Sequence, residues 1–169
     1  MFVVRGTKKF RDRVRQAVPI PEVPASTVLG DWYATALFWR PQVALFVDEQ
    51  TLLPVLVPLA PASTLLSRFP DVLEQVLTAH GVPSWFMGRE LAEMGSHRLE
   101  ATKNRSVIGM LTEFSYLLEH GESSGGADLL ALAVRLAHTP CGPLYRSHTF
   151  PDRELHALIA TIAPDLGAP

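Results

Sequence analysis

Apolar and polar positions follow a strand-like pattern in the first third of the chain and a helical period after it. Three apolar runs, at 32–39, 43–47 and 52–59, are separated by short polar turns. Gaps this short join antiparallel strands, because a parallel crossover needs about a dozen residues or more. The runs therefore predict a meander. Pro54 and Pro58 lie in the third run and cannot donate ladder hydrogen bonds, so this strand is expected at an edge or is expected to break early.

Around the meander, the pattern predicts an N-terminal strand and several helices. Residues 2–6 are rich in β-branched and aromatic side chains. Pro70 interrupts one helical period, so a kink or two short helices are expected there. Gly121 is expected to end the best-patterned helix in a left-handed conformation. The predicted helices span 8–17, 63–80, 85–91, 104–120, 128–137 and 150–162, and a further short strand is predicted at 97–102.

These elements predict an α+β fold, in which a small, mostly antiparallel sheet packs against several helices. The sheet would consist of the N-terminal strand and the three-strand meander. A chain of 169 residues with 47% apolar composition is long enough to bury a sizeable core. A Ser- and Gly-rich linker at 122–126 divides it. We expect a core domain at 1–121 and a C-terminal helical extension at 127–169, packed on the same domain.

The start of the helix at 104–120 is the first candidate site. Asn104 stands where its side-chain oxygen can accept a backbone N–H one turn into the helix. Lys103, Arg105 and Ser106 flank it, and the positive end of the helix dipole favours an anion there. Two interpretations are open: an anion-binding site, or a plain helix cap with two solvated bases, which is the commoner arrangement.

A second candidate is the sequence Gly30-Asp31-Trp32-Tyr33, where a carboxylate and two large rings meet at a strand entrance. Such rings can stack a base or line a pocket. They can equally be packing residues whose single polar atom is satisfied inside the protein.

Charge is unevenly distributed, although the net charge is only −2. Six basic residues and one acidic residue give residues 1–20 a charge of +5, and nine basic and sixteen acidic residues give the remainder −7. Lys8, Lys9 and Arg11 are part of this basic segment. It can be an electrostatic footprint for nucleic acid. It can also be a solvated helix face docked against the chain's own acidic part.

Several kinds of chemistry are not indicated. A single cysteine, Cys141, excludes an internal disulfide, and six scattered histidines lack the spacing of a helical metal site, so no metal is expected. The sequence has no phosphate-binding Gly-rich loop, and we expect no cofactor. It also lacks a window of about 18 apolar residues and a signal-peptide core, which predicts a cytoplasmic protein without a membrane partner. The oligomeric state is left open.

The chain contains LGDWYA at 29–34, LFVDEQTLLP at 45–54 and TKNRSVIG at 102–109. These three stretches resemble a small bacterial family of unknown function. Members also tend to open with a strand followed by a Thr-Lys-Lys-like helix start, as at 7–9 here, and often carry Asn where this chain has Thr112. The resemblance covers about residues 1–120 and implies a bacterial source and a shared site at Asn104, Arg105 and Ser106. It implies no activity, and the part from Gly121 onward looks like an addition.

The first function that we expect is a non-enzymatic binding module for nucleic acid or another anionic partner, because no acid–base pair with diagnostic spacing is visible. One alternative is an enzyme acting on a phosphate-bearing substrate, with Asp31 or Tyr33 as acid or base. The other is a protein-interaction subunit whose basic helix docks on an acidic partner. The expected ligand-binding residues are Lys8, Lys9, Arg11, Trp32, Lys103, Asn104, Arg105 and Ser106.

Overall fold

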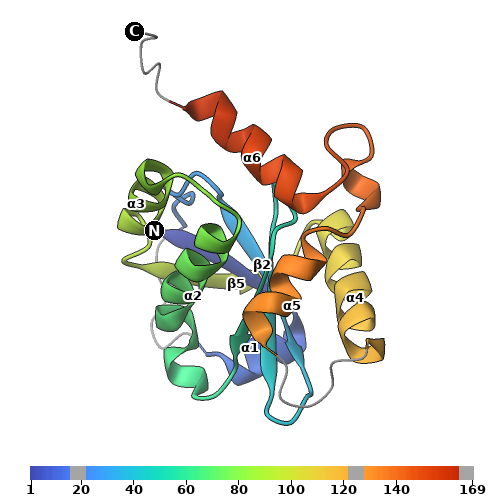
Figure 1. Ribbon diagram of the computed structural model, residues 1–169. Helices are drawn as coiled ribbons and strands as arrows, with labels where there is room; N and C mark the ends of the chain where they lie inside the picture. Colours follow the sequence, from blue (N-terminus) through green and yellow to red (C-terminus); the bar gives the residue numbers. More distant parts are fainter. Residues whose placement is uncertain (16–21, 122–127, 164–169) are drawn as a thin grey trace, which may run out of the picture.

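A computed structural model describes residues 1–15, 22–121 and 128–163 of the chain. It contains a five-stranded sheet with helices on both sides (Figure 1). The strands are β1 (Phe2–Gly6), β2 (Asp31–Leu37), β3 (Val43–Asp48), β4 (Pro54–Pro58) and β5 (His97–Ala101). The helices are α1 (Lys8–Arg13), α2 (Leu65–Ala79), α3 (Ser84–Ala92), α4 (Arg105–His120), α5 (Leu129–Leu136) and α6 (Pro151–Ile162), with single 3₁₀ turns at Ala62–Thr64 and Gly142–Leu144.

The strand order is β4-β3-β2-β1-β5, which confirms the predicted α+β fold with its N-terminal strand and meander. β2, β3 and β4 pair antiparallel, as their short connections predict. β1 lies between β2 and β5 and runs parallel to both. β4 contains Pro54 and Pro58 and is at an edge of the sheet, as expected for a strand with two missing donors.

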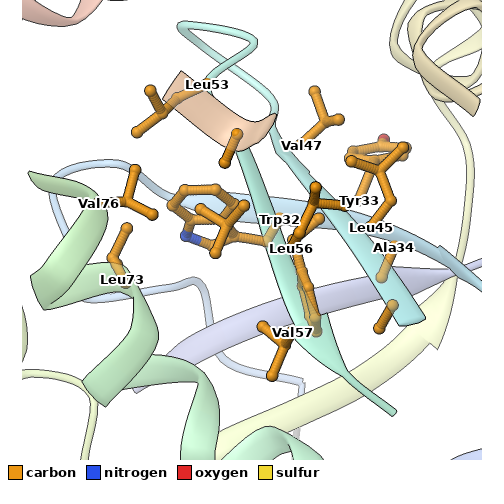
Figure 2. Close-up of a cluster of buried hydrophobic side chains, with 14 of the residues drawn as sticks. Trp32, Tyr33, Ala34, Leu45, Val47, Leu53, Leu56, Val57, Leu73 and Val76 are labelled. Carbon is orange, nitrogen blue, oxygen red and sulfur yellow. The ribbon is translucent and has the colours of Figure 1, made fainter. Parts of the chain in front are cut away.

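Opposite faces of the sheet are covered by different helices. Trp32 of β2 packs edge-to-face against Phe69 of α2, with ring centroids 5.0 Å apart. The next residue, Tyr33, points the other way and reaches the start of α4. Figure 2 shows Trp32 beside Leu73 and Val76 of α2. The sheet is therefore the middle layer, with α2 on one side and α4 on the other (Figure 1).

Two helix ends differ from the sequence-based prediction. The helix expected over 8–17 already ends at Arg13, because Val14 turns to extended geometry and buries its side chain in the core. Gly121 has φ −80° and ψ 164°, so it is not the left-handed cap that we predicted. The chain instead leaves α4 in extended geometry.

Other helix predictions are confirmed or refined. α2 is one continuous helix through Pro70, so the prediction of two short helices was wrong. α3, α5 and α6 lie where the apolar periods placed them. α5 packs on β4 and α2, which places the first part of the C-terminal extension against the sheet and its helix layer.

Candidate functional site

The start of α4 is a capped helix terminus. Asn104 Oδ1 accepts hydrogen bonds from the backbone N–H groups of Ser106 (3.0 Å) and Val107 (3.4 Å). The two N–H groups that an anion would use are thus bound to the protein's own side chain. The predicted cap is confirmed at this position.

The start of α4 is also bonded to β2 and to the turn after β3. The backbone N–H of Asn104 donates to the hydroxyl oxygen of Tyr33 at 3.0 Å. The side-chain amide of Asn104 donates to the carboxylate of Glu49 at 3.2 Å. A carboxylate of the protein therefore already lies at the place where the sequence suggested an external anion.

Asp31 belongs to a neighbouring group of charges on β1, β2 and β5, which we call the strand network: Arg5, Asp31, Arg98 and Glu100. Arg5 contacts Asp31 at 2.6 Å and Glu100 at 2.7 Å, and Arg98 contacts Glu100 at 2.5 Å. Arg5 and Glu100 were not singled out in the sequence. Their spacing from Asp31 in the sequence could not reveal these contacts, because the contacts depend on the parallel register of β1 with β2 and β5.

These surroundings do not favour acid–base chemistry at Asp31 and Tyr33. The carboxylate of Asp31 is held in an ion pair with Arg5. Burial raises the pKa of the Tyr33 hydroxyl, so the phenol keeps its proton and is a weak base at neutral pH. Asp31 serves here as a partner of Arg5, and Tyr33 accepts a hydrogen bond from the backbone N–H of Asn104.

Trp32 lies away from Asp31 and Tyr33, although the three are adjacent in sequence. Its side chain is fully buried on the α2 face, whereas Tyr33 lies near Leu45 and Val47 (Figure 2). Successive strand residues point to opposite faces, which separates the two rings. Trp32 is a core residue in this structure, and a ligand at the surface cannot reach its ring.

The remaining expected ligand-binding residues are all exposed. Lys103, Arg105 and Ser106 are at the start of α4. Lys8, Lys9 and Arg11 project from α1, where Lys8 forms an exposed ion pair with Asp12 at 2.9 Å and Arg11 donates to the carbonyl of Gly6. Lys9 contrasts with them, because it contacts an exposed aromatic ring and lines a cavity.

That ring is Phe38, which follows β2 and is 58% exposed. The ammonium group of Lys9 lies 5.2 Å from its centroid and the guanidinium of Arg13 lies 5.8 Å from it. On α4, the exposed Tyr116 stacks on His120 with centroids 4.1 Å apart. We refer to Lys9, Arg13, Phe38, Tyr116 and His120 as the aromatic–basic rim.

Between the two parts of the rim is a surface hollow of about 350 Å³. Its walls come from the link between β1 and α1, the start of α1, the middle of β2 and the stretch of α4 from Ile108 to Glu119. The lining residues are Thr7, Lys9, Thr35, Ile108, Leu111, Thr112, Ser115, Tyr116 and Glu119. Its size is within the range of about 300–1,000 Å³ that is typical of small-ligand sites.

Of the residues in the rim and the hollow, Lys9 alone was expected from the sequence to bind a ligand. Phe38 appeared as one of several apolar residues in a predicted strand, and Tyr116 as a position on a helix. An exposed aromatic side chain beside basic residues is a recognisable feature only after the strand end and the two helices are placed together.

Metal and membrane chemistry gain no support from the part of the chain that the structure describes. Within 1–15, 22–121 and 128–163, no group of three or more His, Cys, Asp or Glu side chains is arranged to hold a metal ion. No helix in those ranges is long and apolar enough to cross a membrane. Burial raises the pKa of the Cys141 thiol to about 12, so this cysteine is not a ready nucleophile.

Comparison with known proteins gives a family but no activity. No curated protein and no solved structure matches the chain. A family model described as a domain of unknown function, DUF6933, matches residues 3–154. The match extends beyond the expected limit near residue 120, so α5 lies within the family's domain and is not an addition to it. The chain therefore belongs to the DUF6933 family.

Proposed function

We propose that the protein is a non-enzymatic module that binds single-stranded nucleic acid across the aromatic–basic rim. The observation that carries the proposal is Phe38, a large apolar ring that is 58% exposed and has two cations, Lys9 and Arg13, lying over it. Proteins that bind single strands combine positive charge for the backbone with aromatic faces for the bases.

The positive charge of α1 supports this proposal. α1 and the residue that follows Val14 contribute Lys8, Lys9, Arg11, Arg13 and Arg15 against one acidic residue, Asp12. The ion pair of Lys8 with Asp12 is exposed, and such pairs are weak, so it leaves most of the positive potential in place. A polyanion would therefore approach this side of the molecule.

The enzyme alternative has less support. It required Asp31 or Tyr33 as a proton-transfer group near Lys103 and Arg105, and the structure holds Asp31 in the strand network and Tyr33 against Asn104. If the basic surface binds an acidic protein instead of a nucleic acid, the oligonucleotides in the experiment below should show no affinity. A cytoplasmic location, where RNA is available, is part of the proposal.

The test measures the affinity for fluorescently labelled, short, single-stranded oligonucleotides by anisotropy over a range of salt concentrations. Affinity should fall steeply between about 50 and 200 mM salt, because each phosphate contact releases condensed counterions. The double variant Lys9→Ala/Arg13→Ala should lower the slope of log affinity against log salt by about 1.4, at roughly 0.7 per contact for single strands.

A matched control removes the same charge from the other candidate site. Lys103→Ala/Arg105→Ala should leave affinity and salt slope close to those of the unmodified protein. Phe38→Ala should lose about 1–3 kcal/mol of binding free energy if a base stacks on this ring. If the unmodified protein binds no oligonucleotide at about 50 mM salt, the proposed function is wrong.

A further inference from the structure

The hollow beside the rim has walls of different hydrogen-bonding character. On α4, the hydroxyl of Thr112 donates to the carbonyl of Ile108 at 3.2 Å, and that of Ser115 donates to the carbonyl of Leu111 at 2.6 Å. A hydroxyl has one proton, so both oxygens offer only lone pairs to anything in the hollow. Glu119, one turn further along α4, adds a carboxylate to the same lining.

The opposite wall can also donate. The hydroxyls of Thr7 and Thr35 bond to each other at 3.1 Å, which uses one of their two protons and leaves one for a ligand. Lys9 supplies a cation on this side and also contacts Phe38 at the rim. The hollow is therefore an acceptor-only surface along α4 that faces a surface at α1 and β2 with hydrogen-bond donors.

The hydrogen-bonding groups of the two walls favour a ligand that can donate hydrogen bonds. A phosphate offers only acceptor atoms, so it would meet the lone pairs of Thr112 and Ser115 and the negative charge of Glu119 without a proton to share. A sugar hydroxyl can donate and accept. It matches the α4 wall, while a phosphate attached to the sugar can stay outside near Lys9 and Arg13.

We propose that the hollow binds a ribose of the nucleic acid and accepts a hydrogen bond from its 2′-hydroxyl, so that the protein prefers RNA to DNA. This inference rests on the proposed function, because it assumes that a strand lies across the rim. The 2′-hydroxyl is the group by which a protein distinguishes the two polymers at a given position. Deoxyribose would leave the acceptors of the α4 wall without a donor.

The experiment compares three oligonucleotides of one pyrimidine sequence: RNA, DNA and 2′-fluoro RNA. The fluoro form keeps the ribose-like sugar conformation but lacks the hydroxyl proton. RNA should bind about tenfold more tightly than either of the other two, the factor that corresponds to one hydrogen bond of about 1.4 kcal/mol. If 2′-fluoro RNA binds as tightly as RNA, sugar conformation and not the hydroxyl is recognised, and the inference is wrong.

A pair of variants on α4 locates the effect. Ser115→Ala removes one acceptor of the hollow and should bring the RNA-to-DNA ratio towards one by weakening RNA binding alone. Ser106→Ala makes the same substitution at the exposed start of α4 and should leave the ratio unchanged. Glu119→Gln keeps an acceptor oxygen and should retain most of the preference.

The possible results separate the inference from the proposed function. Equal affinity of the unmodified protein for RNA and DNA would overturn the ribose site while leaving the nucleic-acid module intact. Binding to neither would overturn both. A preference for RNA that persists unchanged in Ser115→Ala would show that the hydroxyl is read elsewhere and would contradict the assignment to the hollow.

Discussion

The two ends of α4 contain similar polar residues but use them differently. At its start, Asn104 is bonded to both Tyr33 and Glu49. Towards its end, Thr112 and Ser115 donate inward to the helix and leave their oxygens facing a hollow. The first arrangement completes the fold, and the second leaves bonding capacity for a ligand. A cluster of polar residues in a sequence does not distinguish these cases. The difference depends on whether other groups of the protein already form hydrogen bonds with these residues.

The largest expected effect concerns the network near the start of α4. Arg5→Met should destabilise the protein by about 3–5 kcal/mol, because it leaves the poorly exposed carboxylate of Asp31 without its cation and leaves Glu100 with Arg98 alone. Urea unfolding followed by circular dichroism measures the change. Lys9→Met is the matched control at the hollow. It should change the free energy of unfolding by less than about 0.5 kcal/mol. If both variants lost the same stability, the distinction between polar groups that complete the fold and those left for a ligand would fail.

Asp48, which precedes Glu49, should make stability depend on pH. Burial raises the pKa of its carboxyl to about 8 from the ordinary value of 3.8. In the unfolded chain the group ionises first, so stability should fall as pH rises from about 4 to about 8 and level off above that range. Asp48→Asn should flatten this part of the curve, which thermal melts across that range would reveal. A wild-type stability that rises steadily over the same range would contradict the assignment.

The cap of α4 has a smaller expected effect. Asn104→Ala should cost about 1 kcal/mol, because the N–H groups of Ser106 and Val107 lose their acceptor. Arg105→Ala should change stability by less than about 0.5 kcal/mol, and on the present account it should also leave binding unchanged. Chemical unfolding and the anisotropy assay test both variants. A loss of binding in Arg105→Ala would show that the binding site includes the start of α4.

The smallest change in stability should come from the hollow itself. Thr112→Ala replaces an exposed side chain with a better helix former, so the protein should be unchanged or slightly more stable. RNA affinity should nevertheless fall. A variant that loses both stability and binding would indicate that Thr112 supports the fold and does not contact the ligand.

Local rules were sufficient for much of the fold. The position of Asn104 before an apolar helical period predicts that it caps the helix. The two prolines of β4 predict that this strand lies at an edge of the sheet. Long-range register was not accessible in the same way. The parallel pairing of β1 with β2 and β5 joins Arg5 to Asp31 and Glu100, and nothing local specifies it.

The candidate site was only partly predictable for the same reason. Lys9 was expected to bind a ligand because it belongs to a basic segment. The hollow depends on Thr7, Thr35 and Thr112, which come from three elements and look unremarkable in the sequence. Trp32 was wrongly expected to bind a ligand, because its neighbours in the sequence are polar or aromatic. In the strand its side chain points into the core.

The most direct test is a map of backbone amide shifts by NMR as unlabelled single-stranded RNA is added to the isotope-labelled protein. α4 rises about 1.5 Å per residue, so Arg105 and Ser115 are about 15 Å apart along the helix and can be distinguished. The account predicts shifts at Lys9, Phe38 and along Thr112–Glu119, with little change at Lys103–Ser106. Shifts confined to Lys103–Ser106 would contradict it.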